Sequence, residues 1–262
     1  MIKVEKNFSS VPNILKSENR KEAFENNIHS SAYVDKDNRY KVGSVQKKLN
    51  EIYHLKCAFC EQKLLDSPKH IEHYRPKDTY YWLAYSWDNL LLACGSCNSS
   101  KGDRFKTINS RVVYNNEQFD DIHGFGNSYD DIEKPLIVNP EKDDVLKHIK
   151  YDNEGIVFSE NVRVKHTIDK ACKLNRDELV GKRLPILNDF VSQMNKHYKL
   201  FGQYGDYTRF EPDVEIFLEK MNEESEFYSF RYFILNNVEI FFENENMQKI
   251  LKKLIQKVSN AS

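Results

Sequence analysis

The feature that most constrains this chain is a pair of Cys-x-x-Cys turns, Cys57/Cys60 and Cys94/Cys97, with 33 residues between them. Each turn can present two sulfurs to one ion, and four thiolates are the ligand set of a closed, tetrahedral zinc site. In a reducing cytoplasm such pairs indicate a metal rather than disulfides. The fifth cysteine, Cys172, lies in a helical pattern and is predicted to be a small buried side chain. The intervening segment must therefore fold inside a loop that the metal closes.

The first half of that loop carries three ionisable side chains just before a proline. His70, Glu72 and His73 lie within four residues, and Pro76 follows. Three such groups make a poor core pattern, so we expect a short strand that has a chemical role. A neutral imidazole is a suitable base for activating water, and a carboxylate supplies a hard oxygen for Mg²⁺ or Mn²⁺.

The second half of the loop approaches the second cysteine turn through an apolar run at 90–93, which predicts a buried strand. Asn89 precedes this run, where its amide can bond to backbone and fix a loop. Asn98 directly follows the last cysteine, so a bound zinc would fix where its amide oxygen points. Lys101 and Arg104 are three residues apart on the predicted helix and would share a face, as a phosphate grip or as a solvated pair.

Charge and hydropathy exclude two classes of protein. The chain of 262 residues has a formal net charge of −1, which argues against a surface coated in phosphate-binding charge, although a nuclease needs only a local basic rim. No apolar run approaches the ~20 residues of a membrane span. Residues 1–6 contain no apolar core of a secretory signal. The sequence therefore predicts a cytoplasmic protein without a membrane segment.

Periodicity over the rest of the chain predicts an α+β fold that is mainly helical. Three parts are expected: a lead-in segment at 1–45, a zinc-stapled catalytic domain at 46–110, and a mostly helical region at 135–262 that binds a partner or substrate. The smaller elements expected are a helix at 42–55, an acidic linker at 107–134, a buried strand at 135–140, a hairpin at 149–158, continuous helix from 167, and helices at 211–222, 226–241 and 246–259. The acidic stretch 211–226 favours contact with a protein.

The motif block resembles the zinc-stabilised form of the HNH endonuclease family, also called the ββα-metal or His-Me finger. The resemblance implies that the four cysteines hold a structural zinc. It implies that His73 is the general base, that Asn89 orients the central loop, and that Glu72 and Asn98 hold a catalytic Mg²⁺ or Mn²⁺. Glutamate replaces the commoner aspartate, and asparagines occupy two positions that are often histidine, which bears on the preferred metal. The nearby basic side chains are candidate nucleic-acid contacts: Arg75, Lys77, Lys101 and Arg104.

Strand geometry leaves one alternative for these roles. Adjacent residues on a regular strand point to opposite faces, so Glu72 and His73 share a site only if the strand ends or twists there. If the strand stays regular, His70 and Glu72 would form the pair on one face. His70 is therefore a further candidate ligand or phosphate contact.

A narrower resemblance extends over residues 57–185. It rests on the segments 70–77 (HIEHYRPK), 136–140 (LIVNP) and 174–179 (LNRDEL), with the Gly155 hairpin and Arg183. These are similar to HNH proteins of bacterial anti-phage operons, namely the nuclease subunit of Septu systems and the retron-associated HNH endonucleases. The resemblance implies a partner, an ABC/AAA-like ATPase encoded in the same operon, and in the retron context RNA or DNA of the retron.

The function predicted is a metal-dependent endonuclease that hydrolyses phosphodiester bonds, with DNA favoured, as the effector of an anti-phage complex. RNA is the alternative substrate. Two rivals remain open: a zinc-finger binding or scaffold protein whose motif is inert, and an HNH enzyme that acts alone on a defined DNA site. A redox role for the cysteine pairs is disfavoured because no βαβ pattern surrounds them.

Overall fold

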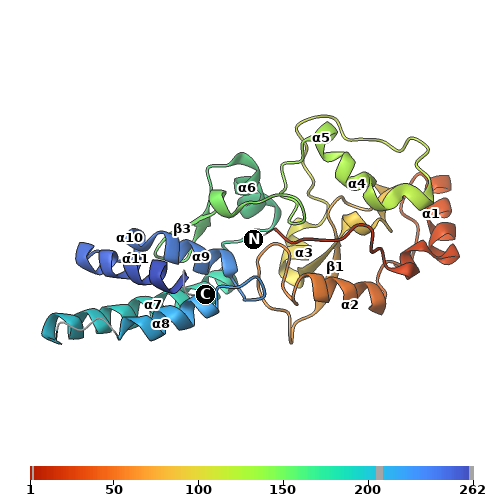
Figure 1. Ribbon diagram of the computed structural model, residues 1–262. Helices are drawn as coiled ribbons and strands as arrows, with labels where there is room; N and C mark the ends of the chain where they lie inside the picture. The colour runs from red at the N-terminus through yellow and green to blue at the C-terminus, as the bar shows by residue number, and fades with distance from the viewer. Residues whose placement is uncertain (2, 205–208, 260–262) are drawn as a thin grey trace.

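The computed structural model describes residues 1, 3–204 and 209–259, and it is a mixed α+β fold with far more helix than strand. Helices α1 to α5 and the strands β1 and β2 lie at one end of the molecule, and helices α7 to α11 lie at the other (Figure 1). No helix among the described residues is long and apolar enough to cross a membrane.

At the end of the molecule that contains α1 to α5, the central feature is an antiparallel pair of strands followed directly by a helix. β1 (Lys69–His73) pairs with β2 (Leu90–Cys94), so that His73 lies opposite Leu90 and Lys69 opposite Cys94. All of β2 is buried, as its unbroken apolar run predicted. α3 (Gly95–Lys101) begins immediately after β2. The expected ββα unit is therefore confirmed.

Other elements surround this unit. The helices are α1 (Glu18–Ser30), α2 (Gly43–Ile52), α4 (Phe125–Ser128), α5 (Asp130–Glu133), α6 (Val162–His166), α7 (Asp177–Tyr204), α8 (Phe210–Glu219), α9 (Tyr228–Asn236), α10 (Val238–Phe241) and α11 (Glu245–Ser259). A second hairpin joins β3 (Lys150–Tyr151) to β4 (Val157–Phe158), and short 3₁₀ turns are η1 (Asn13–Lys16), η2 (Tyr81–Leu83), η3 (Trp87–Asn89), η4 (Phe119–Gly124) and η5 (Leu146–His148).

The predictions of α2, of the second hairpin and of the C-terminal helices are confirmed, but the continuous helix from 167 is not. A π-helical turn at Thr167–Ala171 follows α6, and α7 begins only at Asp177. The predicted strand at 135–140 is wrong as well. Apart from an isolated bridge between Pro135 and Thr107, its backbone bonds to side chains and to irregular backbone, such as the N–H of Val4, which donates to the carbonyl of Pro140 at 2.7 Å. Tyr74 and Arg163 donate to the carbonyl of Ile137, for example, so no strand partner is needed.

The lead-in segment packs firmly on the ββα unit. The ammonium of Lys6 is buried and donates to the carbonyls of Trp87 and Leu90 at 2.6 Å each, and to Glu141 at 2.9 Å. α1, within the lead-in segment, buries Phe24. These contacts fix the loop that precedes β2 from outside the motif.

The predicted acidic linker at 107–134 is also packed against the ββα unit rather than free. Its last helical residue, Glu133, is fully buried and accepts from the guanidinium of Arg75 at 2.9 and 3.0 Å. Asp130 accepts from the same guanidinium at 2.6 Å. Tyr80 donates to the other Glu133 oxygen at 2.7 Å. The segment folds because a buried arginine needs carboxylate partners, a requirement that local periodicity does not report.

Glu133→Ala should therefore destabilise the fold strongly, because it leaves the guanidinium of Arg75 buried with its main partner missing. We expect a loss of about 3–5 kcal/mol in the free energy of unfolding, measured by urea titration. Asp131→Ala, which removes an exposed ion pair with Lys134, is the matched control and should cost less than about 1 kcal/mol. Equal effects of the two substitutions would contradict this account.

His123, in the same segment, makes the stability depend on pH. It accepts from the backbone N–H of Trp87 through Nδ1, at 3.2 Å, and its burial lowers the pKa of the imidazole to about 4. The neutral form is thus favoured in the folded state. The stabilisation is complete above about pH 6.5 and is lost as the pH falls from there to about 4.

His123→Gln, which cannot titrate, should reduce the slope of the unfolding free energy against pH between 6.5 and 4, while the contribution of His73 to that slope remains. The change removed is at most about 3 kcal/mol, from a pKa difference of roughly 2.5 units. Urea titrations at several pH values measure it. His29→Gln, at an exposed position of α1, should leave the slope unchanged. An unaltered slope in His123→Gln would refute the assignment.

Candidate functional site

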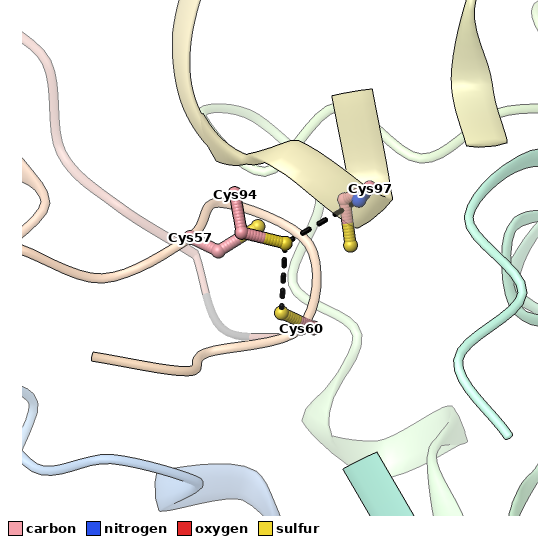
Figure 2. Close-up of side chains that lie close together, drawn as sticks. All are labelled: Cys57, Cys60, Cys94 and Cys97. Carbon is pink, nitrogen blue, oxygen red and sulfur yellow. Dashed lines mark hydrogen bonds between the residues drawn. The ribbon is translucent and has the colours of Figure 1, made fainter. Parts of the chain in front are cut away.

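The two cysteine turns meet at one point. The sulfur atoms of Cys57, Cys60, Cys94 and Cys97 all lie within 4.8 Å of one another, and all four residues are buried (Figure 2). The sulfurs of Cys60 and Cys94 are 3.8 Å apart. A tetrahedral zinc with bonds of about 2.3 Å requires sulfur separations of about 3.8 Å. The donor set and its spacing therefore fit a closed zinc site.

Backbone hydrogen bonds shape both turns before any metal is considered. In the first, the N–H of Glu61 donates to the carbonyl of Cys57, and Glu61 adopts a left-handed φ of 62° that turns the chain back. The N–H of Ala58 donates to the carbonyl of Leu92 at 2.8 Å, which joins this turn to β2. In the second, Cys94 caps α3 because its sulfur accepts from the N–H of Cys97 at 3.3 Å. A cation bound here would lock the turn onto the ββα unit.

We expect the purified protein to contain about one zinc per chain. Cys60→Ser should lose most of that zinc and lower the thermal midpoint, because three thiolates leave the loop incompletely closed. Metal analysis and thermal unfolding are the measurements. Cys172→Ala is the matched control, since this buried cysteine contacts Cys97 but is not one of the four clustered sulfurs, and it should keep its zinc. Normal zinc content in Cys60→Ser would contradict the site.

His73 is held in one tautomer by the backbone. Its Nε2 lies 2.9 Å from the carbonyl oxygen of Ala84, which can only accept, so Nε2 carries the proton and Nδ1 is left bare. The ring of Tyr40 packs edge-on against the imidazole with centroids 4.4 Å apart. Burial lowers the pKa of His73 to about 3, although the Ala84 contact opposes the shift. The imidazole is therefore neutral over the whole neutral range and can accept a proton at Nδ1.

Asn89 fixes the loop that follows β1. Its side-chain oxygen accepts from the N–H of Arg75 at 2.7 Å, and its amide donates to the carbonyls of Arg75 and Leu83 at 3.1 Å each. The Leu83 contact places the amide next to Ala84, whose carbonyl orients His73. The amide thus lies where the loop-orienting role proposed from the sequence would require it.

Glu72 is buried against a lysine. The ammonium of Lys101 donates to Oε1 of Glu72 at 2.7 Å and to the carbonyl of His73 at 2.6 Å, and the lysine side chain has no exposed surface. Burial raises the pKa of the Glu72 carboxyl, and the nearby Lys101 charge opposes that shift. The second oxygen, Oε2, remains available to a cation.

Two of the four predicted nucleic-acid contacts face the interior instead. Lys101 spans β1 and α3 as described, and Arg75 is 1% exposed because Asp130 and Glu133 bind it. Lys101 and Arg104 do not share a face, because α3 ends at Lys101 and Arg104 is exposed. Lys77 is half-buried, with its ammonium over the ring of Tyr33 at 4.1 Å. Lys77 and Arg104 therefore remain candidate contacts.

A cleft of about 180 Å³ brings the remaining predicted residues together. Its lining includes Glu72, His73, His70 and Asn98. His73 is the last residue of β1, so Glu72 and His73 both reach the cleft despite being adjacent, which resolves the strand-geometry alternative without excluding His70. Glu72 and Asn98 offer hard oxygen donors, which fit Mg²⁺ or Mn²⁺. Among the described residues, the four cysteines alone form a cluster of three or more Cys, His or carboxylate donors, so any such cation would need substrate or water to complete its shell.

Sequence reasoning missed several residues that line this cleft, among them Tyr40, Lys41 and the carboxylates of Asp78 and Asp103, and it missed the Ala84 carbonyl that orients His73. Tyr40 and Lys41 come from the segment before α2, and the Ala84 carbonyl comes from the loop between the strands. Tyr40 and Lys41 lie outside the motif, and a backbone carbonyl leaves no residue signature. Only the short-range motif itself could have been found from spacing.

Residues 57–104 match the family model described as HNH endonuclease. The chain carries an HNH endonuclease domain.

Among similar proteins, the Septu protein PtuB of Bacillus mycoides (strain KBAB4) is 30% identical over 168 residues, covering 57% of this chain and 53% of that protein. The Septu protein PtuB of Bacillus thuringiensis is 29% identical over 154 residues, covering 58% and 49%. The Septu protein PtuA of Bacillus mycoides (strain KBAB4) is 25% identical over 159 residues, covering 56% and 21%. The alignments thus span about half the length of the two PtuB relatives.

Proposed function

We propose that this chain is a metal-dependent endonuclease that hydrolyses phosphodiester bonds, with DNA the favoured substrate, as the effector of an anti-phage defence complex. The single observation that carries the proposal is the orientation of His73. Its protonated Nε2 is tied to the Ala84 carbonyl, and its bare Nδ1 belongs to a residue that lines the same cleft as Glu72 and Asn98. This is the arrangement that a general base beside a cation site requires.

In the proposed reaction, Nδ1 of His73 accepts a proton from water, and the resulting hydroxide attacks phosphorus in line. Because the Ala84 carbonyl holds the proton on Nε2, Nδ1 is the nitrogen that can accept one. Asn89 keeps the Arg75–Ala84 loop in place, so the imidazole ring does not rotate away from the cleft. The bond between phosphorus and the 3′ oxygen breaks, the leaving oxygen takes a proton from solvent water, and the products carry 5′-phosphate and 3′-hydroxyl ends.

Glu72 and Asn98 would hold Mg²⁺ or Mn²⁺, which when bound stabilises negative charge on the phosphate and on the leaving oxygen. Lys101 keeps the carboxyl of Glu72 at the edge of the cleft through Oε1. His70, which lines the same cleft, would contact the substrate phosphate or complete the cation's shell.

The substrate strand would leave the cleft past Lys41 and His70. These two residues also line a neighbouring hollow of about 170 Å³ together with Lys69, so basic side chains extend away from the cleft, whose own lining also includes the carboxylates of Asp78 and Asp103. Lys77 and Arg104 would flank it. These contacts are to phosphates and carry no sequence information, so RNA is the alternative substrate.

A partner subunit is part of the proposal. Similarity to PtuB and PtuA supports a place in a two-component Septu-like system. We propose that the partner is an ABC/AAA-like ATPase of the same operon that licenses cleavage, with a retron RNA or DNA as a further component where the operon encodes one. The complex would act in the cytoplasm. The helical region at 135–262 would bind the partner, and the acidic residues of α8 favour a basic surface on it.

His73→Ala should lower the cleavage rate about 10²–10⁴-fold, because it removes the proton acceptor and leaves the cation site intact. The assay uses the co-purified complex with Mg²⁺ or Mn²⁺ and compares double-stranded DNA, single-stranded DNA and RNA. His29→Ala, an exposed histidine of α1, is the matched control and should cleave normally.

Each outcome of this assay decides between the candidate functions. Loss of DNA cleavage in His73→Ala supports the proposal, and cleavage of RNA alone selects the alternative substrate. If neither the wild-type complex nor the variant cleaves any of these substrates while the zinc content is intact, the proposed nuclease activity is wrong and a scaffold protein stabilised by zinc is favoured.

A further inference from the structure

A guanidinium from outside the HNH domain lies directly on the zinc-site sulfurs. Arg176 places Nη2 3.5 Å from the sulfur of Cys97 and 3.6 Å from that of Cys94, and Nη1 3.6 Å from Cys97. These distances are N–H···S hydrogen bonds. Arg176 belongs to the short segment between the π-helical turn and α7, 72 residues after the end of the matched domain.

The contact has a clear electrostatic reason. Four thiolates around one Zn²⁺ carry a net charge of −2 in a buried place, and a fixed cation that donates to the sulfurs reduces the charge that they must share. Backbone carbonyls of the preceding residues hold the guanidinium in this position. Nη1 also donates to the carbonyls of Cys172 and Lys173, at 3.1 and 3.3 Å, and the side chain is only 18% exposed.

The same region touches the cysteine turns at further points. Ser96, in the second turn, donates to Glu178 at the start of α7 at 3.4 Å. Glu61, directly after Cys60, accepts from the N–H and the hydroxyl of Ser229 in α9, at 2.9 and 2.6 Å. Lys63 donates its N–H to Glu226 at 2.9 Å. The C-terminal helical region therefore rests on both turns, and Arg176 is the contact that reaches the metal ligands.

We propose that Arg176 is a positioning residue of the zinc centre: it neutralises the thiolates and couples metal retention to docking of the C-terminal helical region. The coupling works in both directions, because metal and docking favour the same arrangement of the turns. The proposal concerns metal and docking only, so it holds or fails independently of nuclease activity.

The first experiment measures the rate at which the full-length protein releases zinc to an excess of a chromogenic chelator. Arg176→Met should release zinc about 10–100-fold faster than the wild type, the range in which outer-shell partners affect metal affinity. Arg176→Lys keeps the positive charge but loses the bidentate contact, so its rate of zinc release should lie between those of the wild type and Arg176→Met. Lys170→Met, at an exposed lysine of the preceding π-helical turn, is the matched control and should behave as the wild type.

The second experiment measures docking by limited proteolysis of the segment 172–177. The coupling predicts that Arg176→Met exposes this segment to cleavage with zinc still bound, and that chelator treatment of the wild type exposes it too. Release of zinc at the wild-type rate from Arg176→Met would overturn the role at the metal. Faster release without faster proteolysis would overturn the coupling. If Arg176→Met does not fold, the same comparison is made with Arg176→Lys, for which wild-type behaviour in both assays overturns the proposal.

Discussion

Closure of one loop by four sulfurs is the constraint on which the rest of the structure depends. A two-stranded hairpin with one short helix cannot bury enough apolar surface to be stable alone. The cysteine turns solve this at both ends: the first is bonded to β2 through Ala58 and Leu92, and the second is the junction of β2 and α3. Groups that line the cleft can then be held in place by a unit of very few residues, because the ends of the unit do not move independently.

The cleft itself is built from buried charge as much as from packing. Lys101 lies beneath Glu72, Lys6 beneath the start of β2, and Arg75 beneath the loop of Asn89. Each cation donates to backbone carbonyls or carboxylates that would otherwise be unpaired. Such interior ion pairs add little net stability, but loss of one partner is costly, so they favour one arrangement over its alternatives.

The motif block could be predicted closely from the sequence, because its signals are local. Spacing alone located the sulfur cluster, and the apolar run at 90–93 located β2. The positions of Arg75 and Lys101 could not be predicted in this way. Basic residues near a nuclease motif are expected on the surface, and only the distant Glu133 and the turn of α3 show why these two point inward. The acidic segment 107–134 was misjudged for the same reason, since Asp130 and Glu133 lie 55 and 58 residues from their partner Arg75 in the sequence.

The pairing of Arg75 with Glu133 also bears on the order in which the chain matures on the ribosome. All four cysteines leave the exit tunnel before Glu133 does, so a nascent chain can take up its ion while the guanidinium of Arg75 still lacks its counter-charge. The cysteine turns therefore precede, along the chain, the carboxylates that neutralise Arg75, so the interior of the ββα unit can be completed only once α5 has been synthesised.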